Sequence, residues 1–210
     1  MAAHDKRPHA MTMQAQPLQL DPATALLPID IQRGFDHPPW GPRDNPAMDD
    51  NGRRLLAAWR ASGRPLIHVR HDSLDAGSSL HPSHPGNAFR DGFEPLPGET
   101  LLPKSVNAAF IGTDLDLRLR RLGVRSVVLF GISTDMCVST TARVAANLGY
   151  RTIVVGDACQ CFDLPDGDGN TIPAAEIARA HLATLRAEFA EVFDTAAVVA
   201  ALRGADAVSS

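Results

Sequence analysis

The stretch SVVLFGISTDMCVSTTARVAANLGY, from Ser126 to Tyr150, decides the fold of this chain. Its first five residues form a continuous apolar run that predicts a buried strand, and residues Val138 to Leu148 predict a helix that Gly149 ends. A buried strand that leads directly into a helix is the repeating unit of parallel α/β sheets. Cys137 lies at the junction, immediately before the predicted helix.

Strand-like and helix-like segments alternate along the rest of the chain. Strands are predicted at residues 25–30, 65–69, 152–155 and 191–193, and helices at residues 48–62, 115–122, 174–189 and 196–202. Because the strands are continuously apolar, they are predicted to be covered on both faces. The sequence therefore predicts an α/β fold with a doubly wound, mainly parallel, Rossmann-like sheet and helices on both faces. Pro28 leaves the regularity of the first strand open, because it lacks a ladder hydrogen bond.

Two residues with chemical potential follow strands of this predicted sheet. Asp30 ends the first strand, and Cys137 lies just past the strand that ends at Phe130. In doubly wound sheets, ligands bind beyond the carboxyl ends of the strands, where the strand order reverses. If these two strands are neighbours at that point, the carboxylate and the thiol face the same crevice. The stretch Arg70–Pro103 is long and irregular, which predicts a functional lid or binding loop.

Composition limits the classes of function. The chain has 210 residues, enough for one domain, which we place at residues 21–204 between a disordered tail at 1–20 and a C-terminal tail at 205–210. A net charge of -4 without a basic patch argues against nucleic acid as a partner. No stretch has the length and hydrophobicity of a membrane helix or a signal peptide, so we expect no membrane partner. Three cysteines do not form a disulfide framework, which favours a cytoplasmic location.

Cys137, Asp30 and Lys104 are the candidates for chemistry, and each has a plainer interpretation. A thiol at a helix N-terminus is favoured as a thiolate, so we predict a lowered pKa for Cys137, although most cysteines are simply small buried residues. Asp30 could be a general base or only a strand end. Lys104 could stabilise an anion in the crevice, although most lysines are solvated.

Three segments together resemble one known family. They are DIQRGF at residues 30–35, PKSVNAAF at residues 103–110 and GISTDMCV at residues 131–138. In this order they resemble the isochorismatase-like cysteine hydrolase superfamily, over about residues 23–202. The resemblance implies that family's hydrolase fold and a catalytic triad of Asp30, Lys104 and Cys137. It also implies a non-proline cis peptide between Ile132 and Ser133, with the backbone N–H groups of Ser133 and Cys137 as an oxyanion hole.

The presence of a thiol selects between branches of that family. True isochorismatases cleave a vinyl ether without a nucleophilic thiol, so Cys137 favours the branch that cleaves C–N bonds of amides, ureides or carbamoyl compounds through a thioester. That branch includes nicotinamidases, ureido-acid amidohydrolases and a streptothricin hydrolase. The alternatives are a vinyl ether hydrolase and a catalytically silent binding protein of the same fold. The family resemblance also implies a homo-oligomer, a dimer or tetramer.

The remaining expectations concern ligands. We predict substrate contacts from Gln32, Phe35, His71 and Phe110, with core packing as the alternative for the two phenylalanines. We predict no metal, because the Asp-x-His pair of metal-binding relatives is missing, and no cofactor, because the sequence has no Walker or dinucleotide glycine motif. The alternative is a metal site from His71, His81 and His84. The partner that we expect is therefore a small-molecule amide or ureide alone.

Overall fold

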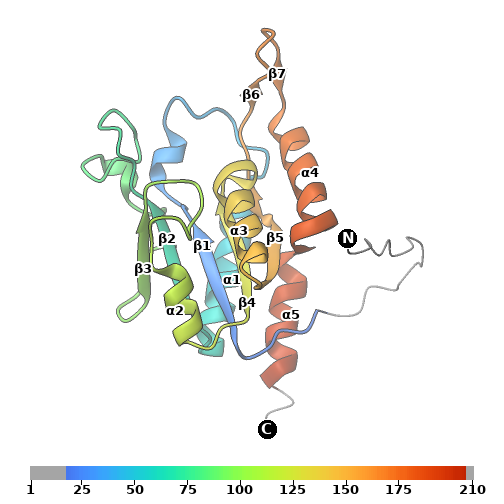
Figure 1. Cartoon of the computed structure of the whole chain (residues 1–210). Helices are drawn as coiled ribbons and strands as arrows, with labels where there is room; N and C mark the ends of the chain where they lie inside the picture. Colours follow the sequence, from blue (N-terminus) through green and yellow to red (C-terminus); the bar gives the residue numbers. More distant parts are fainter. Residues whose placement is uncertain (1–17, 207–210) are drawn as a thin grey trace, which may run out of the picture.

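Six parallel strands form the main sheet of this computed structural model, which describes residues 18–206 (Figure 1). The strand order is β3-β2-β1-β4-β5-β8, and every neighbouring pair is parallel. The strands are β1 (Thr24–Ile29), β2 (Ile67–His71), β3 (Thr100–Lys104), β4 (Ser126–Ile132), β5 (Arg151–Gln160) and β8 (Glu191–Phe193). The predicted doubly wound α/β fold is confirmed.

Helices cover both faces of this sheet (Figure 1). The α-helices are α1 (Met48–Ser62), α2 (Leu115–Arg121), α3 (Ser139–Asn147), α4 (Ala174–Thr184) and α5 (Thr195–Asp206). Shorter helical turns are η1 (Arg33–Asp36), η2 (Pro85–Asn87), η3 (Thr134–Val138) and η4 (Leu185–Phe189). Helices α1 and α5 pack against each other on one face, and α2 and α3 lie on the other. A small hairpin of β6 (Leu164–Pro165) and β7 (Thr171–Ile172) projects away from the sheet (Figure 1).

The strand order reverses between β1 and β4, which lie side by side along their whole length. From β1 the chain moves outward through β2 to β3, and then returns to place β4 on the other side of β1. The expected switch point is therefore present, with Asp30 and Cys137 at its carboxyl end. Pro28 does not interrupt β1, which is continuous, fully buried and in register with Phe130.

A glycine lets the two central strands approach at this end of the sheet. Gly131 has a φ of 135°, and a Cβ atom there would collide with the backbone of Ile29. Only glycine adopts this conformation readily, because it has no Cβ. The close approach brings the segment after β4 against the end of β1.

Several predicted elements and boundaries differ from the structure, and β5 is the longest extension, at Arg151–Gln160 against the predicted 152–155. The edge strand β3 was not predicted, because its residues Thr100–Lys104 include Pro103 and lie at the end of an irregular stretch. Leu18 and Leu20 belong to the hydrophobic core, so the packed chain includes residues that we assigned to the N-terminal tail. Helix α5 extends to Asp206, beyond the predicted start of the C-terminal tail. The rest of the two predicted tails, residues 1–17 and 207–210, lies outside the described residues.

Within residues 18–206, no helix combines the length and hydrophobicity that a membrane span requires.

Candidate active site

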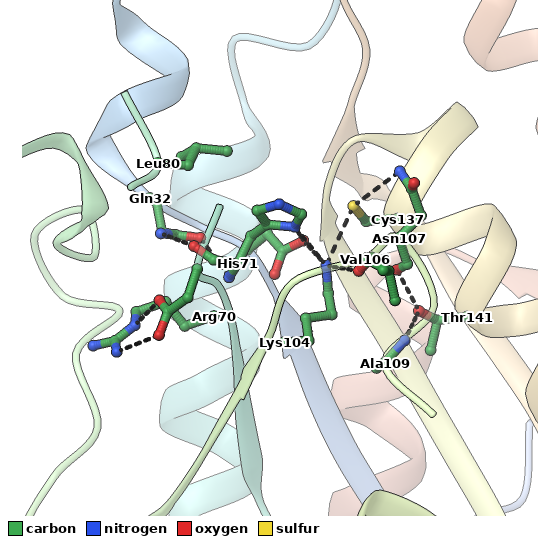
Figure 2. Close-up of polar contacts among 12 residues, drawn as sticks. Gln32, Arg70, His71, Leu80, Lys104, Val106, Asn107, Ala109, Cys137 and Thr141 are labelled. Carbon is green, nitrogen blue, oxygen red and sulfur yellow. Dashed lines mark hydrogen bonds and ion pairs between the residues drawn. The ribbon is translucent and has the colours of Figure 1, made fainter. Parts of the chain in front are cut away.

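Asp30, Lys104 and Cys137 meet at the carboxyl end of the sheet, where Figure 2 shows Lys104 beside Cys137. Asp30 follows β1, Lys104 ends β3, and Cys137 lies in η3, directly after β4. The Nζ atom of Lys104 lies 2.6 Å from Oδ2 of Asp30 and 3.4 Å from Sγ of Cys137. Three segments that are far apart in the sequence thus place a carboxylate, an ammonium and a thiol in contact.

The carboxylate of Asp30 is fully buried and has one oxygen left over. Its backbone has a φ of 52°, in the left-handed region that aspartate tolerates better than most residues. Oδ2 accepts the ion-pair hydrogen bond from Lys104, whereas Oδ1 has no hydrogen-bond partner among residues 18–206. The Asp30 carboxylate and the Cys137 sulfur lie within 4.8 Å of each other. Oδ1 is therefore available to accept a proton.

Cys137 lies just before α3, as predicted, in a π-helical turn that the sequence did not predict. The turn η3 spans Thr134–Val138 and leads into α3. The Cys137 residue is 6 % exposed, and its Sγ accepts hydrogen bonds from Nζ of Lys104 and, at 3.6 Å, from Nδ2 of Asn107. The peptide bond between Ile132 and Ser133 is cis, as the family resemblance implied.

The predicted low pKa of the Cys137 thiol is wrong. Burial is the largest influence and raises the pKa of Cys137, the negative charge of Asp30 raises it further, and Lys104 lowers it. Burial likewise raises the pKa of Asp30, which Lys104 opposes. Two anions in so small a buried volume repel each other, and the Lys104 ammonium pairs with Asp30 at 2.6 Å, so the geometry favours a proton on the sulfur in the resting site.

His71 completes the surroundings of Lys104. Its Nδ1 lies 3.1 Å from Nζ of Lys104 and 4.0 Å from Oδ2 of Asp30 (Figure 2). Burial and the neighbouring Lys104 lower the pKa of His71, so its ring is neutral near pH 7. Because an ammonium can only donate, Nδ1 is the acceptor and the ring proton is on Nε2. The predicted contact of His71 with substrate stays a prediction.

Within residues 18–206, one cluster of side chains has the spacing of metal ligands, and the ammonium of Lys104 occupies its centre. The cluster consists of Asp30, His71 and Cys137, and Nζ of Lys104 lies within hydrogen-bond distance of a ligand atom of each. A divalent cation in the middle of this group would collide with the ammonium and be repelled by it. These residues do not fit a metal while Lys104 is in place. The alternative set of His71, His81 and His84 does not form a group of metal-ligand spacing in the described chain.

The other predicted substrate contacts are occupied within the protein. Gln32 is fully buried, and its side-chain amide forms hydrogen bonds with backbone groups of His71 (Figure 2) and Asn87. Phe35 packs against Trp40 and Phe162, and Phe110 stacks on Tyr150, so both belong to the core. These contacts account for the three side chains without a substrate. Their predicted substrate contacts stay predictions.

Sequence reasoning missed the side chain of Asn107 as a partner of the sulfur. Asn107 lies in the loop after β3 and is exposed, unlike Lys104 and Cys137. The only signal in the sequence is its position three residues after Lys104, inside one of the segments that carried the family resemblance.

Comparison with known proteins agrees with this geometry. Residues 24–197 match the family model described as the isochorismatase domain. The structure superposes with a TM-score of 0.88 on an isochorismatase-family protein from Chromobacterium violaceum, which is 42 % identical, over 91 % of this chain and 100 % of that one. The TM-score is 0.82 for a cysteine hydrolase from Pseudomonas syringae pv. phaseolicola, which is 26 % identical, over 92 % and 100 % of the two chains.

A sequence relative with a stated activity is the streptothricin hydrolase of Streptomyces noursei. It is 32 % identical over 158 residues, which cover 74 % of this chain and 57 % of that protein. The fold and the site together define a hydrolase with a doubly wound α/β fold and an Asp-Lys-Cys triad arrangement. This chain belongs to the isochorismatase-like hydrolase family.

Proposed function

We propose that this protein is a cysteine hydrolase that cleaves a C–N bond in an amide, ureide or carbamoyl group of a small molecule. The observation that carries the proposal is the sulfur of Cys137, which lies 3.4 Å from the ammonium of Lys104 and within 4.8 Å of the carboxylate of Asp30. A nucleophile, a base and a cation in contact are the parts that covalent acyl transfer needs. Similarity to the Streptomyces streptothricin hydrolase and the Pseudomonas cysteine hydrolase supports this class.

The reaction begins when Oδ1 of Asp30 takes the proton from the thiol of Cys137. The sulfur attacks the carbonyl carbon as the proton leaves, so a free thiolate need not accumulate, in keeping with the raised pKa of the thiol. Lys104, which contacts both groups, stabilises the negative charge as it moves from Asp30 to the sulfur. The backbone N–H groups of Ser133 and Cys137 receive the oxyanion in this proposal.

Breakdown of the tetrahedral intermediate returns the proton. Protonated Asp30 donates it to the leaving nitrogen, the C–N bond breaks, and a thioester to Cys137 remains. A water molecule then gives a proton to Asp30 and attacks the thioester carbon. The acid is released, and the thiol regains its proton. One carboxylate serves both half-reactions in this proposal.

The vinyl ether hydrolase and the silent binding protein are the competing functions. Neither requires a thiol, a cation and an unpartnered carboxylate oxygen in contact, so the triad arrangement favours the amide-cleaving enzyme.

The test is a panel of small amides, ureides, carbamoyl compounds and vinyl ethers, assayed for release of ammonia, amine or ketone. We expect turnover on at least one C–N substrate. Cys137→Ala and Cys137→Ser should lower it by about a thousandfold or more, because a serine hydroxyl is too weak an acid for an aspartate base. Asp30→Asn should lower it by about a hundredfold or more. Circular dichroism checks that each variant is folded.

Turnover of a C–N substrate that survives in Cys137→Ala would overturn the thioester route. Turnover confined to vinyl ethers would assign the competing hydrolase function instead.

A further inference from the structure

The loop that follows β3 closes over the sulfur of Cys137. In this loop, the carbonyl oxygen of Val106 accepts a hydrogen bond from Nζ of Lys104 at 3.0 Å. The side chain of the next residue, Asn107, turns its Nδ2 toward Sγ at 3.6 Å (Figure 2). The sulfur therefore faces two side-chain donors from one short segment, an ammonium and a carboxamide.

The position of Asn107 is fixed by the helix that follows the cysteine. The hydroxyl of Thr141, in α3, accepts a hydrogen bond from the backbone N–H of Ala109 at 3.1 Å and lies 3.5 Å from the carbonyl oxygen of Asn107 (Figure 2). Thr141 is fully buried and comes four residues after Cys137, one helical turn further on. One continuous helical segment thus carries both the sulfur and the anchor of the loop that contacts it.

Lys104 has more acceptors around it than N–H groups to give. Its Nζ lies 2.6 Å from Oδ2 of Asp30, 3.0 Å from the oxygen of Val106, 3.1 Å from Nδ1 of His71 and 3.4 Å from Sγ of Cys137. An ammonium has three N–H donors, so four acceptors cannot all be served at once. The contact with sulfur is the longest of the four. When the thiol loses its proton, Lys104 must divide its three N–H groups between the sulfur and three other acceptors.

The charges that face the sulfur make this shortage matter. Before the proton transfer, Asp30 is an anion that is ion-paired with Lys104. His71 has a neutral ring, and its Nδ1 is an acceptor. A buried anion without donors is strongly disfavoured, whereas N–H groups aimed at it stabilise it. The carboxamide of Asn107 is a further donor aimed at that atom.

We propose that Asn107 is a catalytic residue that donates a hydrogen bond from Nδ2 to the sulfur of Cys137 as the thiol gives its proton to Asp30. The inference rests on the proposed function. It adds Asn107 to Asp30, Lys104 and Cys137 as a fourth side chain that takes part in the reaction. The negative charge moves from the sulfur to the carbonyl oxygen of the substrate when the C–S bond forms, and the contact from Asn107 then weakens.

The experiment measures the nucleophile directly and needs no substrate. Iodoacetamide alkylates Cys137 in the full chain over a range of pH, and peptide mass spectrometry gives the rate at this residue alone. The variants are Asn107→Ala, which removes the donor, and Asn107→Asp, which replaces it with an anion of the same shape. Ser105→Ala, at an exposed position in the same loop, is the matched control.

We expect alkylation of Cys137 to slow by about tenfold in Asn107→Ala, the effect of one hydrogen bond to a charged group. The rate-against-pH curve should also move to higher pH. Asn107→Asp should be slower still, and Ser105→Ala should match the wild type. Ultraviolet absorbance of the thiolate, read against Cys137→Ser in each background, should show the same shift in pH.

Equal rates and equal pH curves in the wild type, Asn107→Ala and Asn107→Asp would overturn the role of Asn107. Faster alkylation in Asn107→Asp would overturn it too, because an acceptor, not a donor, would then be assisting the sulfur. A wild-type Cys137 that iodoacetamide does not modify at any pH at which the protein stays folded would instead count against the proposed function. The two failures are therefore distinguishable.

Discussion

Replacing Lys104 with Met should make the stability of the protein depend on pH in a calculable way. The side chains of Lys104 and Asp30 are both fully buried and lie 2.6 Å apart, and Met keeps the length of the stem. Without the ammonium, Asp30 would be an unpaired buried carboxylate, which is strongly destabilising, so it should fold in its protonated form.

The magnitude follows from the cost of protonating an aspartate above its ordinary pKa. With an unfolded pKa of about 3.9, each further pH unit costs about 1.4 kcal/mol, so the penalty is about 4 kcal/mol at pH 7 and about 1.5 kcal/mol at pH 5. The variant takes up a proton on folding, and its stability therefore falls as the pH rises. The difference from the wild type should widen by about 1.4 kcal/mol per pH unit.

Urea titrations followed by circular dichroism at pH 5, 6 and 7 measure this difference. The double variant Asp30→Asn with Lys104→Met should lose the pH dependence, because no buried carboxyl group remains. Arg118→Met, which breaks an exposed ion pair between α2 and the Asp114 before it, should change the stability little and equally at every pH from 5 to 7. A Lys104→Met difference that stays constant with pH would refute the reasoning, since Asp30 would then already be protonated in the wild type and could not be the base.

Three further outcomes are expected. The acid limb of the kcat/KM profile should have its midpoint above about 3.9, the ordinary aspartate value, because burial raises the pKa of Asp30; a midpoint at or below that value would contradict this. Activity should survive EDTA, because Lys104 fills the group in which a cation could bind, and a loss that zinc or iron restores would contradict this. Glu99→Gln should lower the free energy of unfolding by about 2 kcal/mol at pH 7, because hydrogen bonds from Arg60 hold the pKa of Glu99 at about 2. This loss of stability should shrink as the pH falls from about 4 toward 2. A loss that urea titrations find unchanged over that range would contradict the prediction.

The central part of the fold could be predicted because its strands are buried on both faces. β1 and β4 are continuous apolar runs, and such runs are visible in one sequence without knowledge of their neighbours. The strand β3 could not be predicted, because Pro103 lies in it and an edge strand tolerates such a residue. The start of the packed domain at Leu18 was missed, because two leucines in a polar segment do not predict a tertiary contact.

The candidate site, too, could be predicted only in part. The spacing of Asp30, Lys104 and Cys137 after three strands was readable from the family resemblance, and the structure places them in contact. The pKa of Cys137 was not readable, because it depends on burial and on the distance to Asp30, which the sequence does not give. The contact of Asn107 with the sulfur depends on a loop anchored by Thr141, a long-range hydrogen bond that leaves no local pattern.

The central claim is that Cys137 forms a covalent acyl intermediate. The most direct measurement is mass spectrometry of the enzyme, quenched with acid during turnover of a C–N substrate from the panel, with peptide mapping of the modified residue. The account predicts that the peptide containing Cys137 gains the mass of the acyl part of the substrate, and that Cys137→Ala shows neither the adduct nor turnover. Turnover in Cys137→Ala at a rate near that of the wild type, without an adduct on any cysteine, would contradict it.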